Sequence, residues 1–132
     1  MELLHKEITD KVLRAFYTVY NELGFGFLEK VYENAMLIEL RKVGLTCIKQ
    51  EPIRVHYDGY PVGDYFADII VENDIILELK TAEGVAEEHE MQLINYLKAT
   101  DKEIGLLLNF GKKPEFKRKI FTNDRKKIRP AP

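Results

Sequence analysis

The sequence predicts one α/β domain in which a mixed β-sheet lies between helices. Three observations support this prediction. Apolar residues follow a helical period over the first 43 residues, two short apolar runs at 69–71 and 75–77 show no polar alternation, and a third helical segment precedes another apolar run. Apolar runs without alternation are typical of strands that are covered on both faces. The expected order is helix, helix, strand, strand, strand, helix, strand.

Two helices are expected before the sheet. The first should end at Gly24, and its apolar residues recur at three- and four-residue spacing: Leu3, Leu4, Ile8, Val12, Phe16, Val19 and Leu23. After the linker 24–27, a second helix is predicted from about Leu28 to Val43, with Gly44 following its end. Its expected apolar stripe is Val31, Ala35 and Ile38, extended by Met36 and Leu40.

The remaining elements follow from apolar runs and turn signals. Residues 45–56 are expected to be extended, and Pro52 indicates an edge strand or a break there. A turn signal at 57–60 precedes the hairpin that contains the runs 69–71 and 75–77. The third helix is predicted over 85–99 and the next strand over 104–110, and residues 116–121 are suited to a further edge strand.

Length and composition are those of one globular domain with its own core. The chain has 132 residues, of which 45% are apolar and 32% charged. No apolar stretch approaches the length of a membrane span, and the N-terminus lacks the pattern of a signal peptide, so a cytoplasmic protein without a membrane partner is expected. Cys47 is the only cysteine, which excludes an intrachain disulfide and a thiolate metal cluster.

The most informative residues are Asp68, Glu78 and Lys80, which flank the two apolar runs. Ionised side chains on buried strands are costly unless they are paired or bind a cation. Glu78 and Lys80 are two residues apart and share a face of their strand. Asp68 joins them only if residues 72–74 form a three-residue connection, because a two-residue loop would pair Asp68 with Leu79. Two carboxylates at this position predict a site for Mg²⁺ or Mn²⁺, with a lysine beside it.

Each of these features also has a simpler interpretation. Acid-x-lysine triplets are common, so Glu78 and Lys80 could be a surface ion pair. Gln92 and Tyr96 share a face of the third helix, where they either serve the site or face water.

Glu29 and Glu33 form a similar four-residue pair on the second helix. They either point towards Asp68, or Glu29 interacts with the positive end of the helix dipole.

Basic residues are concentrated at the C-terminal end. Nine basic and two acidic residues follow position 111, which gives this segment a charge of +7, whereas the whole chain carries −2. The segment either binds phosphate groups or is a solvated terminus. The candidate nucleic-acid-binding residues are Lys112, Lys113, Lys117, Arg118 and Lys119.

Three motifs, in this order along the chain, resemble those of the PD-(D/E)xK nuclease superfamily. Residues 26–32 match the GxxExxY motif that names a small prokaryotic family assigned to that superfamily. Asp68 with residues 78–80 resembles the superfamily signature, although Ala67 replaces its proline. Residues 92–96 match the QxxxY element of several exonuclease branches. The resemblance covers residues 5–122 and implies a restriction-endonuclease-like core with a central mixed sheet flanked by helices.

The resemblance also implies roles for individual residues. Asp68, Glu78 and the Leu79 carbonyl would bind the metal, and Lys80 would position or activate the attacking water. Glu33 resembles the helix glutamate of archaeal Holliday-junction resolvases and would bind metal directly or through water. Gln92 would support the site, and further supporting roles fall to Glu29, Tyr32 and Tyr96.

The function implied is a Mg²⁺-dependent nuclease that hydrolyses phosphodiester bonds, with DNA favoured over RNA as substrate. The alternative is a non-catalytic module of nuclease fold that binds nucleic acid or a partner protein, since a fold does not determine a function. All acid, lysine and glutamine positions of the motifs are filled, which favours an intact enzyme. A domain of this size is small for binding a duplex alone, so a homodimer or a complex with a partner protein is a further expectation.

Overall fold

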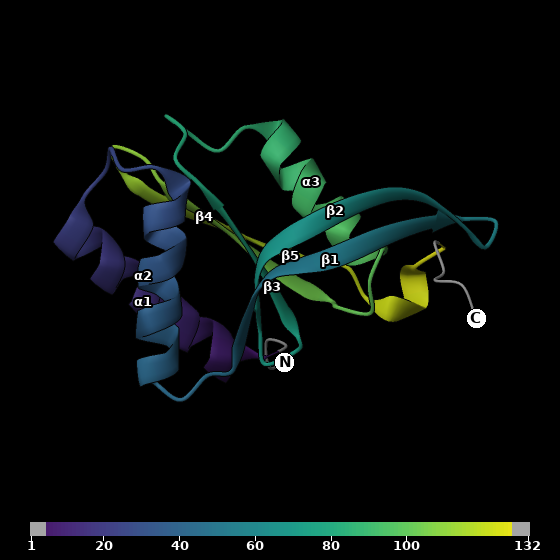
Figure 1. The fold of residues 1–132 in the computed structure, drawn as a ribbon, viewed down its shortest axis with the longest axis horizontal. Coiled ribbons are helices and arrows are strands. Elements are labelled where there is room, and N and C mark those ends of the chain that lie inside the picture. Colours follow the sequence, from purple (N-terminus) through teal and green to yellow (C-terminus); the bar gives the residue numbers. More distant parts are fainter. Residues whose placement is uncertain (1–4, 128–132) are drawn as a thin grey trace.

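The structure, a computed structural model, describes residues 5–127 (Figure 1). Leu3, Leu4 and the basic residue Arg129 lie outside the described residues. The elements in chain order are α1 (Lys6–Leu23), α2 (Glu29–Lys42), β1 (Cys47–Tyr57), β2 (Tyr60–Val71), β3 (Ile75–Lys80), α3 (Glu87–Lys98), β4 (Ile104–Phe110), β5 (Pro114–Ile120) and the short 3-10 helix η1 (Asn123–Arg125).

The strands form one mixed sheet in the order β1-β2-β3-β4-β5. β3 and β4 are parallel and connected through α3, whereas the other neighbouring strands are antiparallel. Pro52 lies on the edge strand β1, where its missing N–H removes no bond from the sheet interior. The predicted α/β fold is confirmed, and β5 supplies the further edge strand.

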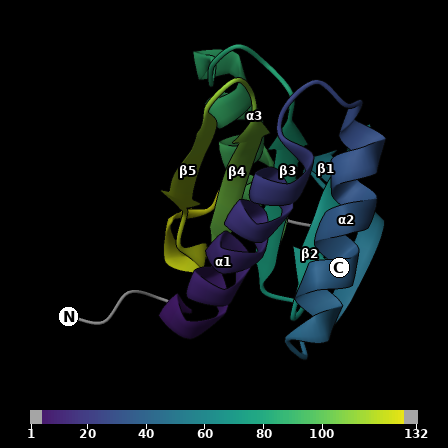
Figure 2. The same ribbon diagram turned by 90° about the vertical axis from the view of Figure 1, so that its left-hand side faces the viewer.

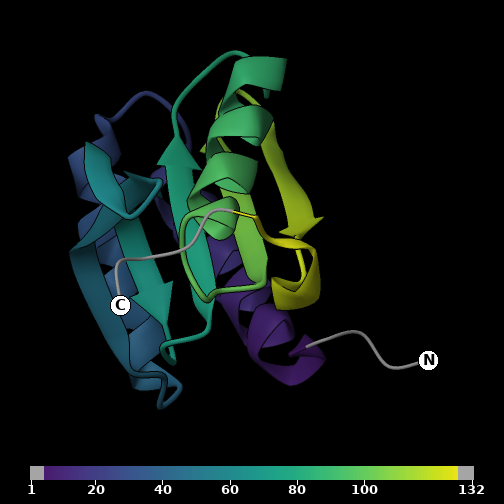
Figure 3. The ribbon, with the colours of Figure 1, turned by 90° about the vertical axis from the view of Figure 1, so that its right-hand side faces the viewer.

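Helices cover both faces of the sheet. α1 and α2 lie over one face (Figure 2), and α3 lies over the other (Figure 3). Two apolar clusters result: one joins α1 and α2 to side chains such as Ile69 and Leu77, and the other joins α3 to Ile70 and Ile76. Burial on both faces is why these runs and the fully buried β4 lack polar alternation.

The apolar stripe predicted for α2 is wrong in part. Val31 and Ile38 are 39% and 59% exposed. The helix instead buries Tyr32, Glu33, Met36, Leu37 and Leu40. Tyr32 takes the inward position because its ring stacks on Phe110, with centroids 4.2 Å apart, and its hydroxyl donates to the Gly24 carbonyl at 2.7 Å. Apolar residues occur on several sides of α2, so tertiary contacts decided which side faces the core.

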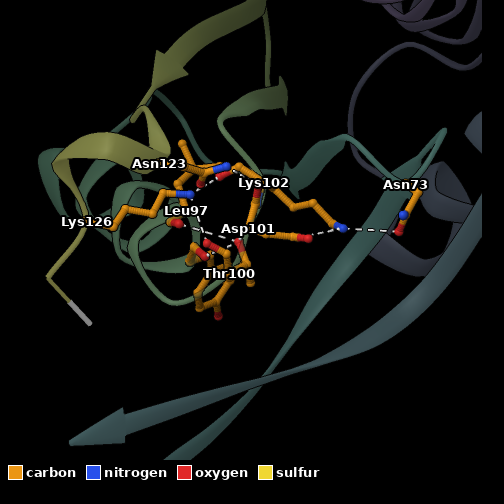
Figure 4. A network of polar contacts seen from close by, with 8 residues as sticks. Asn73, Leu97, Thr100, Asp101, Lys102, Asn123 and Lys126 are labelled. Atoms are coloured by element: carbon orange, nitrogen blue, oxygen red, sulfur yellow. Dashed lines mark hydrogen bonds and ion pairs between the residues drawn. The ribbon is translucent and has the colours of Figure 1, made fainter. Parts of the chain in front are cut away.

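The segment after β5 is packed against the loop between α3 and β4 (Figure 4). The buried Lys126 donates from Nζ to the carbonyls of Thr100 at 2.8 Å and Lys102 at 2.5 Å. Asn123 is bonded to Glu103 and Asp101 in the same region. Lys102 in turn donates from Nζ to Oδ1 of Asn73 at 3.1 Å, which ties the β2–β3 turn to this network.

Candidate active site

The β2–β3 connection is the three-residue loop that the candidate site requires. Val71 pairs with Ile75, Ile70 with Ile76 and Ile69 with Leu77. Glu72 and Asn73 adopt positive φ values of 52° and 57°, and the Asp74 N–H donates to the Val71 carbonyl at 3.0 Å. Continued by one residue, this register places Asp68 opposite Glu78, as the candidate site requires.

The β2–β3 ladder ends just before Asp68 and Glu78, and their side chains take over the bonding. The Asp68 N–H donates to Oε2 of Glu78 at 2.9 Å, and the Leu79 N–H donates to Oδ2 of Asp68 at 2.8 Å. Main-chain N–H groups that leave a sheet ladder need acceptors, and carboxylates are strong ones. Each acid is therefore held by the main chain of the opposite strand.

The two carboxyl groups lie in a strongly acidic environment. Glu78 is only 3% exposed, and its burial, followed by the charge of Asp68, raises its pKa to about 8. Burial also raises the pKa of Asp68, and Glu33 adds to this rise. The charge of Lys80 opposes the shift in both acids. The site thus holds more negative charge than the lysine compensates.

α2 brings two further acids to the site. Glu33 is 6% exposed, and its Oε1 is a buried atom without a hydrogen-bond partner, although Lys30 Nζ lies 3.8 Å away. Such an atom is costly unless something binds it. Glu29 occupies the first turn of α2; partial desolvation raises the pKa of its carboxyl group, and that pKa also responds to the charges of Lys80 and Asp68. Both acids therefore lie on the Asp68 side of the helix.

Gln50 is a site residue that the sequence interpretation missed. It adopts φ = 53° in β1, a left-handed conformation that costs roughly 1 kcal/mol in a residue other than glycine. The ladder pairs Lys49 with Ile69 and Glu51 with Ala67, so Gln50 lies opposite Asp68. Its Nε2 donates to Oε2 of Glu33 at 3.3 Å, and a hydrogen bond from its side chain opposes the rise in the pKa of Asp68. Gln50 thus links the acid of α2 to that of β2. No local pattern in the sequence distinguishes it.

α3 contributes Gln92 and Tyr96 from the other face of the sheet. Nε2 of Gln92 donates a hydrogen bond to the Tyr96 hydroxyl at 3.0 Å, and so this amide is bonded to a tyrosine and not to a carboxylate. Burial, then the charges of Glu78 and Asp68, raise the pKa of Tyr96 to about 12. α3 approaches closely because Gly105 has no side chain: a Cβ there would lie 2.5 Å from Cδ1 of Leu93.

Asn109 is a second residue that the sequence interpretation missed. It is buried in β4 beside Lys80 and forms two bonds to Ala82: Oδ1 accepts from the Ala82 N–H at 2.9 Å, and Nδ2 donates to the Ala82 carbonyl at 3.0 Å. Gly111 permits this arrangement, since a Cβ there would lie 2.5 Å from the Ala82 carbonyl oxygen. The chain that leaves Lys80 is therefore clamped against β4.

Tyr32 lies in the core and not beside the acids. Its hydroxyl accepts from the Phe27 N–H at 3.3 Å and donates to Gly24, so it holds the linker that leads into α2. Any support that Tyr32 gives to the site acts through the position of Glu29 at the start of that helix.

The predicted nucleic-acid-binding residues lie in two places, the β4–β5 turn and strand β5. Lys112 and Lys113 are exposed in the β4–β5 turn, at the end of the sheet where Lys80 lies. Lys119 is bound to Glu90 at 2.5 Å. Lys117 is exposed on β5, and Arg118 beside it is half-buried. Lys112 and Lys113 follow the end of β4 that pairs with Lys80, and Lys117 lies in register with Glu78, two strands away.

The site meets some of the requirements of a divalent metal, although it lacks a complete set of converging side chains among the described residues. Within residues 5–127, no three His, Cys, Asp or Glu side chains converge as a ready-made metal site. Asp68 and Glu78 are brought together, whereas Glu33 reaches them through Gln50. The donors nevertheless suit Mg²⁺: all are oxygens, Glu33 carries an unsatisfied oxygen, and a cation would relieve the charge that raises the pKa of Glu78.

A mixed sheet flanked by helices, with paired acids and a lysine where β2 and β3 end their pairing, is consistent with the restriction-endonuclease-like fold class. Residues 6–119 match the model of the PD-(D/E)XK nuclease superfamily, and the chain belongs to this superfamily. The crystal structure of a protein designated SSO0001 is similar, with a TM-score of 0.55 and 21% sequence identity. The match covers 92% of this chain but 60% of that one, and it supports the fold alone.

No curated protein matches the sequence. Among the described helices, none is long and apolar enough to cross a membrane.

Proposed function

We propose that this protein is a Mg²⁺-dependent nuclease of the GxxExxY branch that hydrolyses phosphodiester bonds, with Mn²⁺ as an alternative metal and DNA favoured over RNA as substrate. The observation that carries the proposal is the pair Asp68 and Glu78. Glu78 is buried and Asp68 is half-buried, both are held by main-chain bonds from opposite strands, and Lys80 accompanies them. A purely structural ion pair would not require two desolvated acids for one lysine.

The carboxylates of Asp68 and Glu78 would hold the metal together with the Leu79 carbonyl, and Glu33 would bind it directly or through water. When bound, the cation would supply Lewis acidity, which lowers the pKa of water and offsets phosphate charge. The main-chain bonds to Asp68 and Glu78 orient both carboxylates before substrate arrives.

Lys80 would position or activate the attacking water and stabilise negative charge that develops on the phosphoryl group. Its place in the β3–β4 ladder and the Asn109 clamp on Ala82 limit its movement. Tyr96 would donate a hydrogen bond to the phosphate, since a tyrosine hydroxyl is protonated at neutral pH and burial raises the pKa of this one further, to about 12. Gln92 would orient that hydroxyl through the bond between them.

The test is cleavage of single- and double-stranded DNA and RNA in Mg²⁺ or Mn²⁺, compared with EDTA. We expect metal-dependent cleavage, and Lys80→Ala should lower kcat by about 10²–10³ in protein that remains folded. Lys6→Ala, which removes an exposed lysine on α1, is the matched control. Cleavage that survives both Lys80→Ala and Asp68→Ala in folded protein would contradict the proposal.

A non-catalytic binding module is the second candidate, favoured by the absence of three converging metal-ligating side chains among residues 5–127. It predicts nucleic-acid or partner-protein binding without cleavage in any metal. A metal titration followed by calorimetry separates the two, since a nuclease should lose Mg²⁺ binding on Asp68→Ala.

A further inference from the structure

A groove of about 630 Å³ lies between α3 and the β1–β2 hairpin, beside the candidate active site. Gln92 and Tyr96 belong both to its wall and to that site. The charges of Glu78 and Asp68 act on Tyr96, so the groove begins next to the acid pair. A ligand whose phosphate lies at the acids could therefore place its adjoining group in the groove.

Aromatic and apolar side chains form much of the groove wall. Tyr65 of β2 is 48% exposed, and its ring lies 5.6 Å from that of Tyr96 between centroids, at an angle of 46°. Met91 is also exposed on the groove side of α3. An exposed tyrosine ring held by a second aromatic ring offers a rigid face for stacking a planar group.

The polar groups of the groove indicate that the occupant is not a phosphate. Glu87 and Glu88 lie on its rim and would repel an anion. Besides the two tyrosine hydroxyls, the groove is lined by the side-chain amides of Gln92 and Asn95, each of which carries both donors and an acceptor. Amides beside an aromatic face suit a neutral planar ligand that has hydrogen-bonding edges.

We propose that this groove is a nucleobase pocket, in which the base next to the scissile phosphate stacks on Tyr65 and forms hydrogen bonds with the amides. The proposal rests on the nuclease function proposed above. A base inside a duplex is stacked and paired and cannot enter such a groove without leaving the helix. The pocket therefore selects substrates whose base at that position is unpaired: single strands, flaps and ends.

The test measures binding in EDTA, so it does not depend on cleavage. A fluorescently labelled single-stranded DNA hexamer is compared with hexamers in which one nucleotide at a time is abasic. For the wild-type protein, one abasic position should weaken binding about tenfold, as loss of one stacked base does. Tyr65→Ala should weaken binding of the intact hexamer by a similar factor, and Tyr65→Phe should restore it.

The two losses should not add, because both remove the same stacking contact. Tyr57→Ala, at the exposed hairpin turn, is the matched control and should bind as the wild type does. Equal wild-type affinity for intact and abasic hexamers would overturn the pocket without any variant. Additive losses for Tyr65→Ala and the abasic position would overturn it as well.

Failure of the pocket and failure of the nuclease proposal give different results. Metal-dependent cleavage without any effect of abasic positions or of Tyr65→Ala rejects the pocket and keeps the nuclease. Base-dependent binding without cleavage keeps the pocket and rejects the nuclease. Absence of any binding to the hexamers rejects the pocket, whatever the cleavage assay shows.

Discussion

The carboxyl group of Glu78 lies buried beside that of Asp68, and each accepts a main-chain hydrogen bond from the other strand. Ionisation of both carboxyl groups would place two negative charges close together in a poorly solvated place, so without metal Glu78 keeps its proton up to a pH of about 8. A cation bound here would offset the cost of ionising both groups. Gln50 lies in the same region and retains a strained backbone conformation. Both features are typical of residues that serve a site and not the stability of the fold.

The raised pKa of Glu78 predicts how stability depends on pH without metal. The folded value of about 8 exceeds the ordinary 4.5, so the folded protein keeps a proton that the unfolded chain loses. The resulting stabilisation is complete below pH 4.5 and is lost as the pH rises to about 8. Glu78→Gln keeps an acceptor for the Asp68 N–H but removes the charge. In EDTA at pH 8.5 we expect this variant to be more stable than the wild type, by roughly 4 kcal/mol in urea unfolding, since one pKa unit corresponds to about 1.4 kcal/mol.

Glu83→Gln, an exposed change in the loop after β3, is the control for this comparison. Added Mg²⁺ should stabilise the wild type and leave Glu78→Gln unchanged. Parallel pH profiles of wild type and Glu78→Gln would contradict the assigned pKa.

At the scale of elements, two glycines set how closely the parts of the site approach one another. Gly105 of β4 lets α3 pack against the sheet through Leu93, which places Gln92 and Tyr96 near the acids. Gly111 lets the loop after Lys80 lie against the end of β4, where Asn109 binds Ala82. β4 contains no proposed catalytic residue, yet it positions elements on both sides of the site.

Gly111→Ala should therefore disturb the chain after Lys80. The added methyl group would meet the Ala82 carbonyl oxygen at 2.5 Å, and main-chain atoms cannot move away as easily as a side chain. We expect a loss of stability of about 1–3 kcal/mol, measured by urea unfolding, together with a lower kcat. Gly84→Ala, in the loop after Lys80 and with nothing within 4 Å of the new Cβ, is the matched control. Equal stability of the two variants would show that the loop is not clamped.

At the scale of the whole molecule, the basic charges after position 111 do not act as one cluster. The sheet places Lys112 and Lys113 at the end where Lys80 lies, whereas Lys119 is bound to Glu90 and Lys126 is buried against the α3–β4 loop. The acidic pair and the two turn lysines thus lie at one end of the molecule. Phosphate groups flanking a scissile bond would meet positive charge there.

Replacing both Lys112 and Lys113 by alanine should weaken single-stranded DNA binding and reduce its dependence on salt. If each lysine neutralises one phosphate, the slope of log K against log salt should become less steep by about 1.4. Lys119→Ala should change the slope less, because this lysine already has a carboxylate partner. Binding isotherms between 50 and 300 mM salt, roughly the range in which such slopes are measured, provide the comparison. An unchanged slope in the double variant would exclude these lysines from phosphate binding.

The sequence by itself determined the elements and their order, and it limited the pairing of Asp68 with Glu78 to a three-residue loop, which the structure then showed. These depend on short-range patterns: helical periodicity, apolar runs, and the number of residues between Val71 and Ile75. Only the tertiary structure decided that α2 turns Tyr32 and not Val31 inward, that Gln50 joins Glu33 to Asp68, and that Asn109 clamps the loop after Lys80. The physical reason is that each of these contacts joins segments far apart in the chain, and the residue types involved carry no local signal. Side-chain packing and hydrogen bonding across the sheet select them only after the strands have assembled.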